Sequence, residues 1–401
     1  MLKKNNTSHF LGILFLLFVL SDFISKAGAF YYNSLIHTSQ ITKGLFQLFA
    51  VGFIVKNNHF KDRFLYVGIG LLLLFHCLGL LFLDSEFSFL NNLKSNVHII
   101  NWYLFVFLLI LAFRSYERTV KFDFSKTIYF LRLCFVGYFY ANLIAAITGF
   151  LIDFELFSSY PYSDRFGFNG LMRNVTHASY IVIIYIIYFY YQYKQSATKR
   201  NLFHLLSALC FVFLLATKAT ILFLLLFFAF IVYKKNKLFF AGLLLIMGIT
   251  PFILKDFLLN QLLPKYFAPL AEVYENQGML PMLTSLRSEQ FTELFLPYVS
   301  ENWGFANYLF GGFDNSLRKI EFELVDLWLT FGLLGILLYL FIFFKYAFPI
   351  VWIKKHSLVL LLFFIVFLAG SFFSSVPVIT VFFVFYLLSS ERLLSNILAN
   401  T

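Results

Sequence analysis

Long apolar stretches recur along the chain, separated by short polar segments. A membrane-spanning helix needs about 20 predominantly apolar residues, and fewer where flanking aromatic residues and lysines reach the interface. On this criterion the pattern predicts twelve spans, at residues 8–24, 41–55, 64–83, 98–113, 128–152, 176–193, 202–217, 219–233, 238–254, 323–344, 357–373 and 375–390. We therefore expect an all-α, polytopic integral membrane protein.

The polar residues are concentrated in one connection. Residues 1–254 hold the first nine predicted spans with short loops, residues 255–322 form a long hydrophilic loop, and residues 323–401 hold the last three spans and a short tail. Loops of this length are uncommon unless they are functional or disordered. This one is rich in aromatic residues and has no low-complexity run, so we expect it to fold into a cap on the outside face.

Composition excludes a water-soluble protein. Of the 401 residues, 61% are apolar and 13% are charged, whereas soluble domains have about 45–50% and about 25%. The three cysteines, Cys77, Cys134 and Cys210, lie inside apolar runs, so a disulfide in an aqueous loop is excluded.

The distribution of charge gives the orientation. A net charge of +11 would suggest nucleic-acid binding in a soluble protein. Here the basic residues gather in alternate short loops, which by the positive-inside rule places both termini in the cytoplasm and excludes a nucleic-acid partner. Lys3 and Lys4 before the first apolar run also fit a signal peptide, but an uncleaved first span is the preferred interpretation.

Motifs of soluble enzymes are absent from the sequence. It has no GxxxxGK[ST], HExxH, CxxC or GxSxG pattern, and its eight histidines form no pair at metal-ligand spacing. We therefore expect neither a metal nor a cofactor.

The first candidate group on the outside face is basic. Arg165 and Arg173 precede the sixth span, which begins near Asn174 or Thr176, residue types that cap helix starts. Backbone N–H groups and the dipole at this helix start, with two arginines beside them, suit a phosphate or diphosphate. His177 lies one turn after Arg173 on the same face. In the alternative interpretation the arginines pair with nearby acids and only shape the loop.

The second and third groups lie at the starts of two further helices. Lys218 occupies a short outside turn, where a cation opposes the helix dipole unless an anion is nearby; it could instead extend to the lipid headgroups. Glu323 and Asp326 open the tenth span on one face, with Glu321 just before them. Acids in a first turn stabilise a helix, but Asp326 lies inside an apolar run and needs a partner, for which the candidates are Arg165, Arg287 and Arg318.

Taken together, these segments resemble the Wzy-type O-antigen and capsular polysaccharide polymerases and their superfamily with the O-antigen ligases. RFGFNGLMRNVTHASY is similar to the family's arginine-and-glycine segment, and LLATKATILF to its SR-type turn, with Lys218 where arginine is usual. SLRSEQFTELF, YLFGGF and EFELVDLWLTFGLLG resemble the rest of the pattern, at Arg287, Gly311, Gly312, Glu323, Asp326, Gly332 and Gly335.

The resemblance implies glycan transfer at the periplasmic face of the bacterial inner membrane. A sugar hydroxyl of one undecaprenyl-diphosphate-linked repeat unit would attack the anomeric carbon of a growing chain and displace undecaprenyl diphosphate. A chain-length regulator and a flippase would be partners. Diphosphate contacts would come from Arg165, Arg173, Arg287 and Lys218, the proton acceptor would be Glu323 or Asp326 with Glu321 and His177 in reserve, and Trp303 would stack on a sugar.

Three other functions stay open on the sequence. A ligase of the same superfamily typically has a functional histidine in the long loop, and residues 255–322 contain none, which favours a polymerase. A flippase or other transporter would instead predict charges buried within the spans and an internal repeat. A membrane scaffold without catalysis is the remaining interpretation.

Overall fold

The computed structural model describes residues 9–56, 62–83, 93–119, 124–162, 165–238, 268–313, 320–346 and 358–373. Within these ranges the chain is almost entirely helical, with two isolated β-bridges and no strand. The helices of the bundle are α1 (Phe10–Tyr31), α2 (Thr38–Lys56), α3 (Arg63–Leu81), α4 (Leu93–Thr119), α5 (Phe124–Ile152), α6 (Val175–Gln195), α7 (Lys199–Leu215), α8 (Lys218–Lys235), α17 (Glu323–Tyr346) and α19 (Leu358–Ala369).

These helices confirm the all-α prediction for the described residues. Each predicted span has a matching helix except those at 238–254, of which only the first residue is described, and 375–390, which lies outside the described residues. By length and composition, α1, α3, α5 and α17 could each cross a membrane, and shorter apolar helices run over Asn101–Tyr116 and α19. The number of spans stays a prediction.

Helix α6 lies at the centre of the bundle. Its residues from Ala178 to Phe189 are all buried, as expected for a helix that is apolar all round. It packs against α7, α8 and α19, and its tyrosine hydroxyls find acceptors: Tyr180 donates to the carbonyl of Gly370 at 2.6 Å and Tyr185 to that of Phe135 at 2.9 Å. Because buried hydroxyls need hydrogen-bond partners, these bonds help to fix the position of α6 along its axis relative to the neighbouring segments.

The two ends of the bundle can be told apart by their ion pairs. Asp62, just before α3, accepts from Arg114 at 3.1 Å and from Arg118 at 3.0 Å, both near the end of α4. The sequence predicts all three residues on the cytoplasmic side. Their contact shows that the start of α3 and the end of α4 share one end of the bundle.

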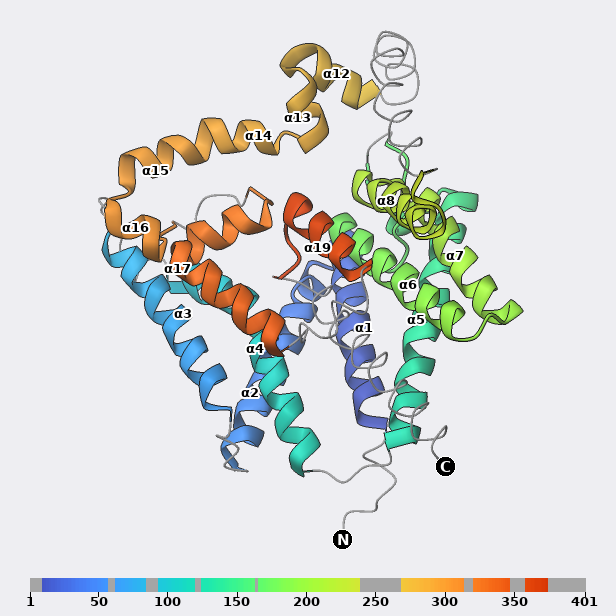
Figure 1. Cartoon of the computed structure of the whole chain (residues 1–401), viewed down its shortest axis with the longest axis horizontal. Coiled ribbons are helices and arrows are strands. Elements are labelled where there is room, and N and C mark those ends of the chain that lie inside the picture. The colour runs from blue at the N-terminus through green and yellow to red at the C-terminus, as the bar shows by residue number, and fades with distance from the viewer. Residues whose placement is uncertain are drawn as a thin grey trace.

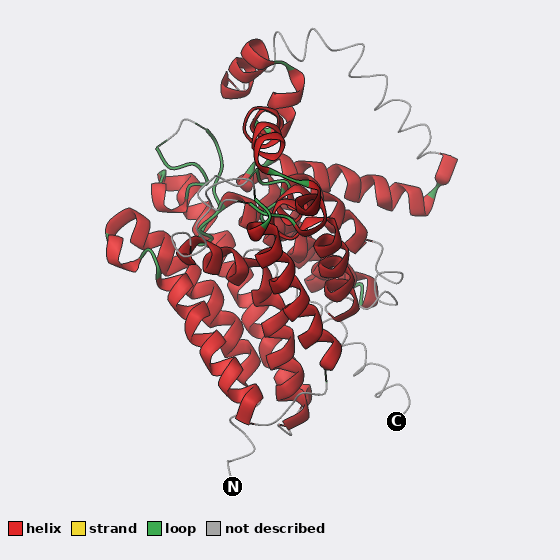
Figure 2. Ribbon diagram, turned by 90° about the vertical axis from the view of Figure 1, so that its left-hand side faces the viewer, coloured by secondary structure: helices red, strands yellow, loops and turns green. Residues whose placement is uncertain are grey.

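The described part of the predicted long loop is folded at the other end. We call residues 268–302 the outer arm: it contains α12 (Ala268–Gln277), α13 (Met279–Thr284), α14 (Arg287–Glu289), the π-helical turn η5 (Gln290–Phe295) and α15 (Leu296–Asn302). Figure 1 shows the arm running across the top of the bundle and joining α16 (Phe305–Phe310) beside α3 and α17. Figure 2, turned by 90°, shows the helices of the bundle below it.

Glycines join the arm to the bundle. Gly332 interrupts α17 with φ 69° and ψ −177°, a conformation open almost only to glycine. The turn after α16 packs into this kink: a Cβ on Gly311 would lie 2.7 Å from the Gly332 nitrogen, and the Gly312 N–H donates to the carbonyl of Leu329 at 3.0 Å. Gly311, Gly312 and Gly332 therefore form one close-packed junction between the turn after α16 and the kink of α17.

Candidate functional site

A cavity of about 580 Å³ lies between the arm and the starts of α6 and α8. We call it the outer cavity. Segments distant in the sequence contribute to its lining: Tyr160, Arg165, Val175, Thr176, Ser179, Thr217, Lys218, Ala219, Leu222, Leu283, Thr284, Ser285, Arg287, Glu321, Phe322, Ile365, Leu368 and Ala369. Three of the predicted cations therefore converge on one space, with one carboxylate among them.

The start of α6 supplies hydroxyl groups to the cavity. Asn174 is the N-cap, as its residue type predicts: its side-chain oxygen accepts from the N–H groups of Thr176 at 2.8 Å and His177 at 3.4 Å. Since these amides already have an acceptor, an anion in the cavity would rely on side chains more than on the helix start. On the cavity side of the same turn lie Thr176 and Ser179.

A chain of hydroxyl groups links α6 to α8. The Ser179 hydroxyl lies 2.7 Å from that of Thr217, which lies 2.9 Å from that of Thr220. Thr217 is the N-cap of α8 and places Lys218 at the first helical position. The two helix starts are thereby held side by side at the cavity.

Lys218 reaches from α8 to the arm. Its ammonium donates to the carbonyl of Met282 and to the Ser285 hydroxyl at 3.0 Å. Burial, and then the positive charges of Arg165 and Arg287, lower the pKa of Lys218 to about 8. The cation therefore stands where a further negative charge would be favourable.

Arg165 approaches the cavity from the folded segment before α6. Its guanidinium lies 4.0 Å above the ring of Tyr160, a cation–π contact. Gly167 holds the segment at φ 151°, where a Cβ would lie 2.9 Å from the carbonyl oxygen of Leu215. Only glycine allows this close approach to the end of α7. The backbone of this segment thus fixes where the arginine emerges.

Arg287 approaches the cavity from the arm and pairs with Glu321. The Nη2–Oε2 distance is 2.9 Å, with the arginine side chain 18% exposed and the glutamate side chain 37% exposed. Counting the formal charges of the described lining residues, Arg165, Lys218 and Arg287 against Glu321 give an excess of two positive charges. A ligand with two or more negative charges complements this cavity.

The two predicted proton acceptors lie elsewhere. Glu323 is 0% exposed and accepts from the backbone N–H groups of Phe372 at 2.8 Å and Phe373 at 3.2 Å. Asp326 is 4% exposed and accepts from the N–H of Ile320 at 3.2 Å. Both share a face at the start of α17, as predicted, but that face is buried against neighbouring backbone and not against the outer cavity.

Other predicted binding residues are also separated from the cavity. Arg173 faces α1 and the turn after it, donating from its backbone N–H to Asp22 at 3.2 Å and from Nη1 to the carbonyl of Ile36 at 3.3 Å. His177 is not among the lining residues. Trp303 is buried and its indole N–H donates to the carbonyl of Gly312 at 2.7 Å. The side chain therefore packs inside the protein. The predicted Arg318 lies outside the described residues.

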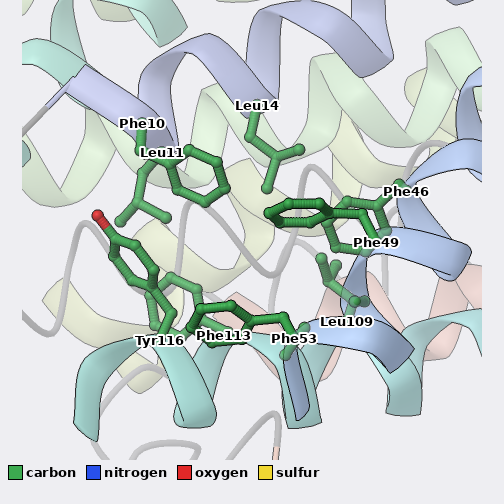
Figure 3. A pocket seen from close by; sticks show the side chains of 11 residues that line it. Phe10, Leu11, Leu14, Phe46, Phe49, Phe53, Leu109, Phe113 and Tyr116 are labelled. Atoms are coloured by element: carbon green, nitrogen blue, oxygen red, sulfur yellow. The ribbon is translucent and has the colours of Figure 1, made fainter. Parts of the chain in front are cut away.

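A second pocket lies beside the first two turns of α1. It measures about 230 Å³ and is lined by apolar and aromatic side chains of α1, α2 and α4. Figure 3 shows Phe10, Phe49, Phe53 and Phe113 turned toward one another around it, with the Tyr116 hydroxyl at its rim. Among its described lining residues, Tyr116 carries the one ionisable group.

Tyr160, Ser179 and Thr217 line the cavity without having been predicted from the sequence, and Thr176 was predicted only as a possible helix cap. Two signals were available for the hydroxyl groups: Thr176 and Ser179 are three residues apart on one helical face, and Thr217 precedes a helix start. No local signal points to Tyr160, which reaches Arg165 only through the fold of its loop.

Within the described ranges, no three His, Cys, Asp or Glu side chains lie together as a metal site would require. Searches against protein-family models, curated proteins and solved structures found no match for this chain. The outer cavity is therefore the basis for any functional assignment.

Proposed function

We propose that the protein joins undecaprenyl-diphosphate-linked oligosaccharide repeat units into O-antigen or capsular polysaccharide at the periplasmic face of the bacterial inner membrane. The observation that carries this proposal is the convergence of Arg165, Lys218 and Arg287 on one cavity. They come from three separate segments, and the described lining residues carry an excess of positive charge.

The shape of the lining also suits a lipid diphosphate. Beside the cations, the cavity has an apolar wall formed by Leu222, Phe322, Ile365, Leu368 and Ala369. A diphosphate bound to the cations could direct its isoprenoid chain along this wall, between α8 and α19, which pack against each other. A free sugar or an inorganic anion would make no use of such a wall.

The chemistry needs no further source of energy. The bond between the anomeric carbon and the diphosphate is already activated, and the protein must chiefly stabilise the charge on the departing diphosphate. Arginines suit this task through bidentate contacts, and Lys218 through a point charge. This is consistent with the absence of nucleotide-binding motifs from the sequence.

The proposal is tested by deleting the gene in its host and separating the surface polysaccharide on a gel. Loss of the ladder, with one repeat unit still attached to the lipid core, is the result expected of a polymerase. Loss of every unit from the core, with long polymer accumulating on its carrier, would identify the alternative, a ligase.

Substitutions then connect the activity to the cavity. Complementation with Arg165→Ala or Arg287→Ala should leave the protein level in the membrane unchanged and abolish long chains. Each arginine is expected to contribute about 1.5–3 kcal/mol to diphosphate binding, the range for hydrogen bonds to charged groups. Retention of long chains in both variants would refute the assignment.

One observation keeps a flippase as the second candidate. Lys26, buried within α1, donates to the Asn169 side chain at 2.6 Å and to the carbonyl of Gly170 at 2.8 Å, and Asp22 is buried one turn before it. Buried charges within an apolar helix are typical of transport pathways. Deletion of a flippase would remove every unit from the core and leave single repeat units, without long polymer, on the lipid carrier.

A further inference from the structure

Among the described residues, Glu321 is the carboxylate that lines the outer cavity. Glu323 and Asp326 both bind backbone N–H groups inside the protein, whereas Glu321 lines the cavity and its side chain is 37% exposed. A proton acceptor must reach the group that it deprotonates. Among the acids at the start of α17, Glu321 alone meets this geometric requirement.

The backbone holds Glu321 in an unusual conformation. Its φ is 66°, which a residue with a Cβ seldom adopts. Gly370, with φ 63°, packs directly on the Glu321 main chain, where any side chain at 370 would overlap the Glu321 carbonyl. The carbonyl of Gly370 in turn accepts from Tyr180 of α6 at 2.6 Å. The surrounding structure therefore fixes a strained residue at the cavity, an arrangement common at functional sites.

The partner of Glu321 is itself one of the cations of the cavity. Arg287 donates to it through Nη2 at 2.9 Å. A guanidinium has five N–H donors, so Arg287 can also meet a diphosphate. As a bound diphosphate draws the guanidinium toward itself, the Glu321 carboxylate loses part of its ion-pair partner and can accept a hydrogen bond from an incoming hydroxyl.

Resting on the proposed function, we propose that Glu321 is the proton acceptor of the transfer reaction, kept idle by Arg287 until a diphosphate enters the outer cavity. The O–H bond of the attacking hydroxyl breaks and its proton passes to the Glu321 carboxylate. The hydroxyl oxygen forms the new bond to the anomeric carbon. The bond from that carbon to the diphosphate breaks, and the diphosphate leaves with the electron pair beside Arg165, Lys218 and Arg287.

The experiment measures binding and turnover separately on the purified full chain in proteoliposomes. Binding is measured with farnesyl diphosphate, a short prenyl diphosphate, and turnover with lipid-linked repeat units from the host. Glu321→Gln keeps an oxygen that can accept from Arg287 and removes one negative charge. It should bind the probe as well as wild type or more tightly, and should polymerise at least about 100-fold more slowly, the lower end of general base effects.

Two further variants separate chemistry from structure. Glu321→Asp should restore part of the rate, and Glu293→Gln, the same change at an exposed position of the arm, should match wild type. If Glu321→Gln kept the wild-type rate, or lost probe binding together with turnover, Glu321 would not be the proton acceptor.

Failure of the proposed function looks different. In that case wild type itself would neither bind farnesyl diphosphate nor extend the repeat units, which would overturn both proposals together. Normal binding and turnover in wild type, with an unaffected Glu321→Gln variant, would remove only the assignment of Glu321.

Discussion

Binding of a prenyl diphosphate to the outer cavity should weaken as the pH rises through about 8, the pKa of Lys218. Burial and the charges of Arg165 and Arg287 lower this pKa, so the ammonium is present below pH 8 and lost above it. With a pKa of 8, its protonated fraction falls from about 90% at pH 7 to about 10% at pH 9. If the ammonium form carries the binding, affinity falls about tenfold over this interval.

Lys218→Arg is the matched control. A guanidinium stays protonated over the whole range, so the variant should lose the part of the pH dependence that lysine causes. The ionisation of the ligand is common to both proteins and cancels in the ratio of their affinities. Lys218→Met should bind weakly at pH 7, by about 10- to 150-fold if the charged hydrogen bond contributes about 1.5–3 kcal/mol. Wild type should approach this variant at high pH.

The assay is equilibrium binding of labelled farnesyl diphosphate to the purified protein between pH 6.5 and 9.5, at constant ionic strength because surface electrostatics are screened by salt. A ratio of wild-type to Lys218→Arg affinity that stays constant across this range would refute the reasoning. It would mean that the Lys218 ammonium does not contact the ligand, and that its bonds to the arm persist when the cavity is filled.

The remaining predictions concern the parts of the fold that position the cavity. Glu323→Ala should lower the thermal midpoint by several degrees and the amount of protein in the membrane, because two buried N–H groups at residues 372–373 lose their acceptor at about 1–3 kcal/mol each; normal stability with lost polymerisation would instead return Glu323 to the chemistry. Gly332→Ala should prevent accumulation of the folded protein, measured by detergent extraction and size-exclusion chromatography, because its Cβ would overlap the Leu309 carbonyl at φ 69°. Gly70→Ala is the matched change at a helical glycine with open space around it, and should leave the protein unaltered; equal yields of both variants would contradict the role of the glycine junction.

The helical pattern could be predicted from the sequence because a membrane-spanning helix needs about 20 predominantly apolar residues, whichever helices it packs against. The predicted span at 128–152 ends at the same residue as α5, and the predicted span at 323–344 begins at the same residue as α17. The kink at Gly332 could not be predicted, since it depends on α16 packing against it. A glycine in an apolar run is equally compatible with a straight helix.

The candidate site was predictable in part. Arg165, Lys218 and Arg287 share a charge, a predicted side of the membrane and a place next to a helix start or inside the long loop, and the structure brings them together. Arg173 has the same sequence features but turns toward α1, because Asp22 accepts from its backbone N–H. That contact joins residues 151 positions apart, and no local pattern reveals it.

The acids show that helical spacing predicts a shared face but not what that face packs against. Glu323 and Asp326 do share one side of α17, yet the chain passes that side twice, at residues 320 and 372–373, with N–H groups that need acceptors. A buried N–H without an acceptor costs free energy, and the two carboxylates accept hydrogen bonds from these groups inside the protein. Glu321 precedes the helix and takes a positive φ, which directs it away from the helical pattern and toward the cavity.

The same groups that could hold a diphosphate also fasten the arm to the bundle. Lys218 of α8 binds Met282 and Ser285 of the arm, and Arg287 of the arm binds Glu321 at the start of α17. A ligand that takes the donors of Lys218 and Arg287 must loosen these contacts or bridge them. Ligand binding and the position of the arm are therefore coupled. The free energy by which a bound ligand weakens the contacts of the arm equals the free energy by which those contacts weaken ligand binding.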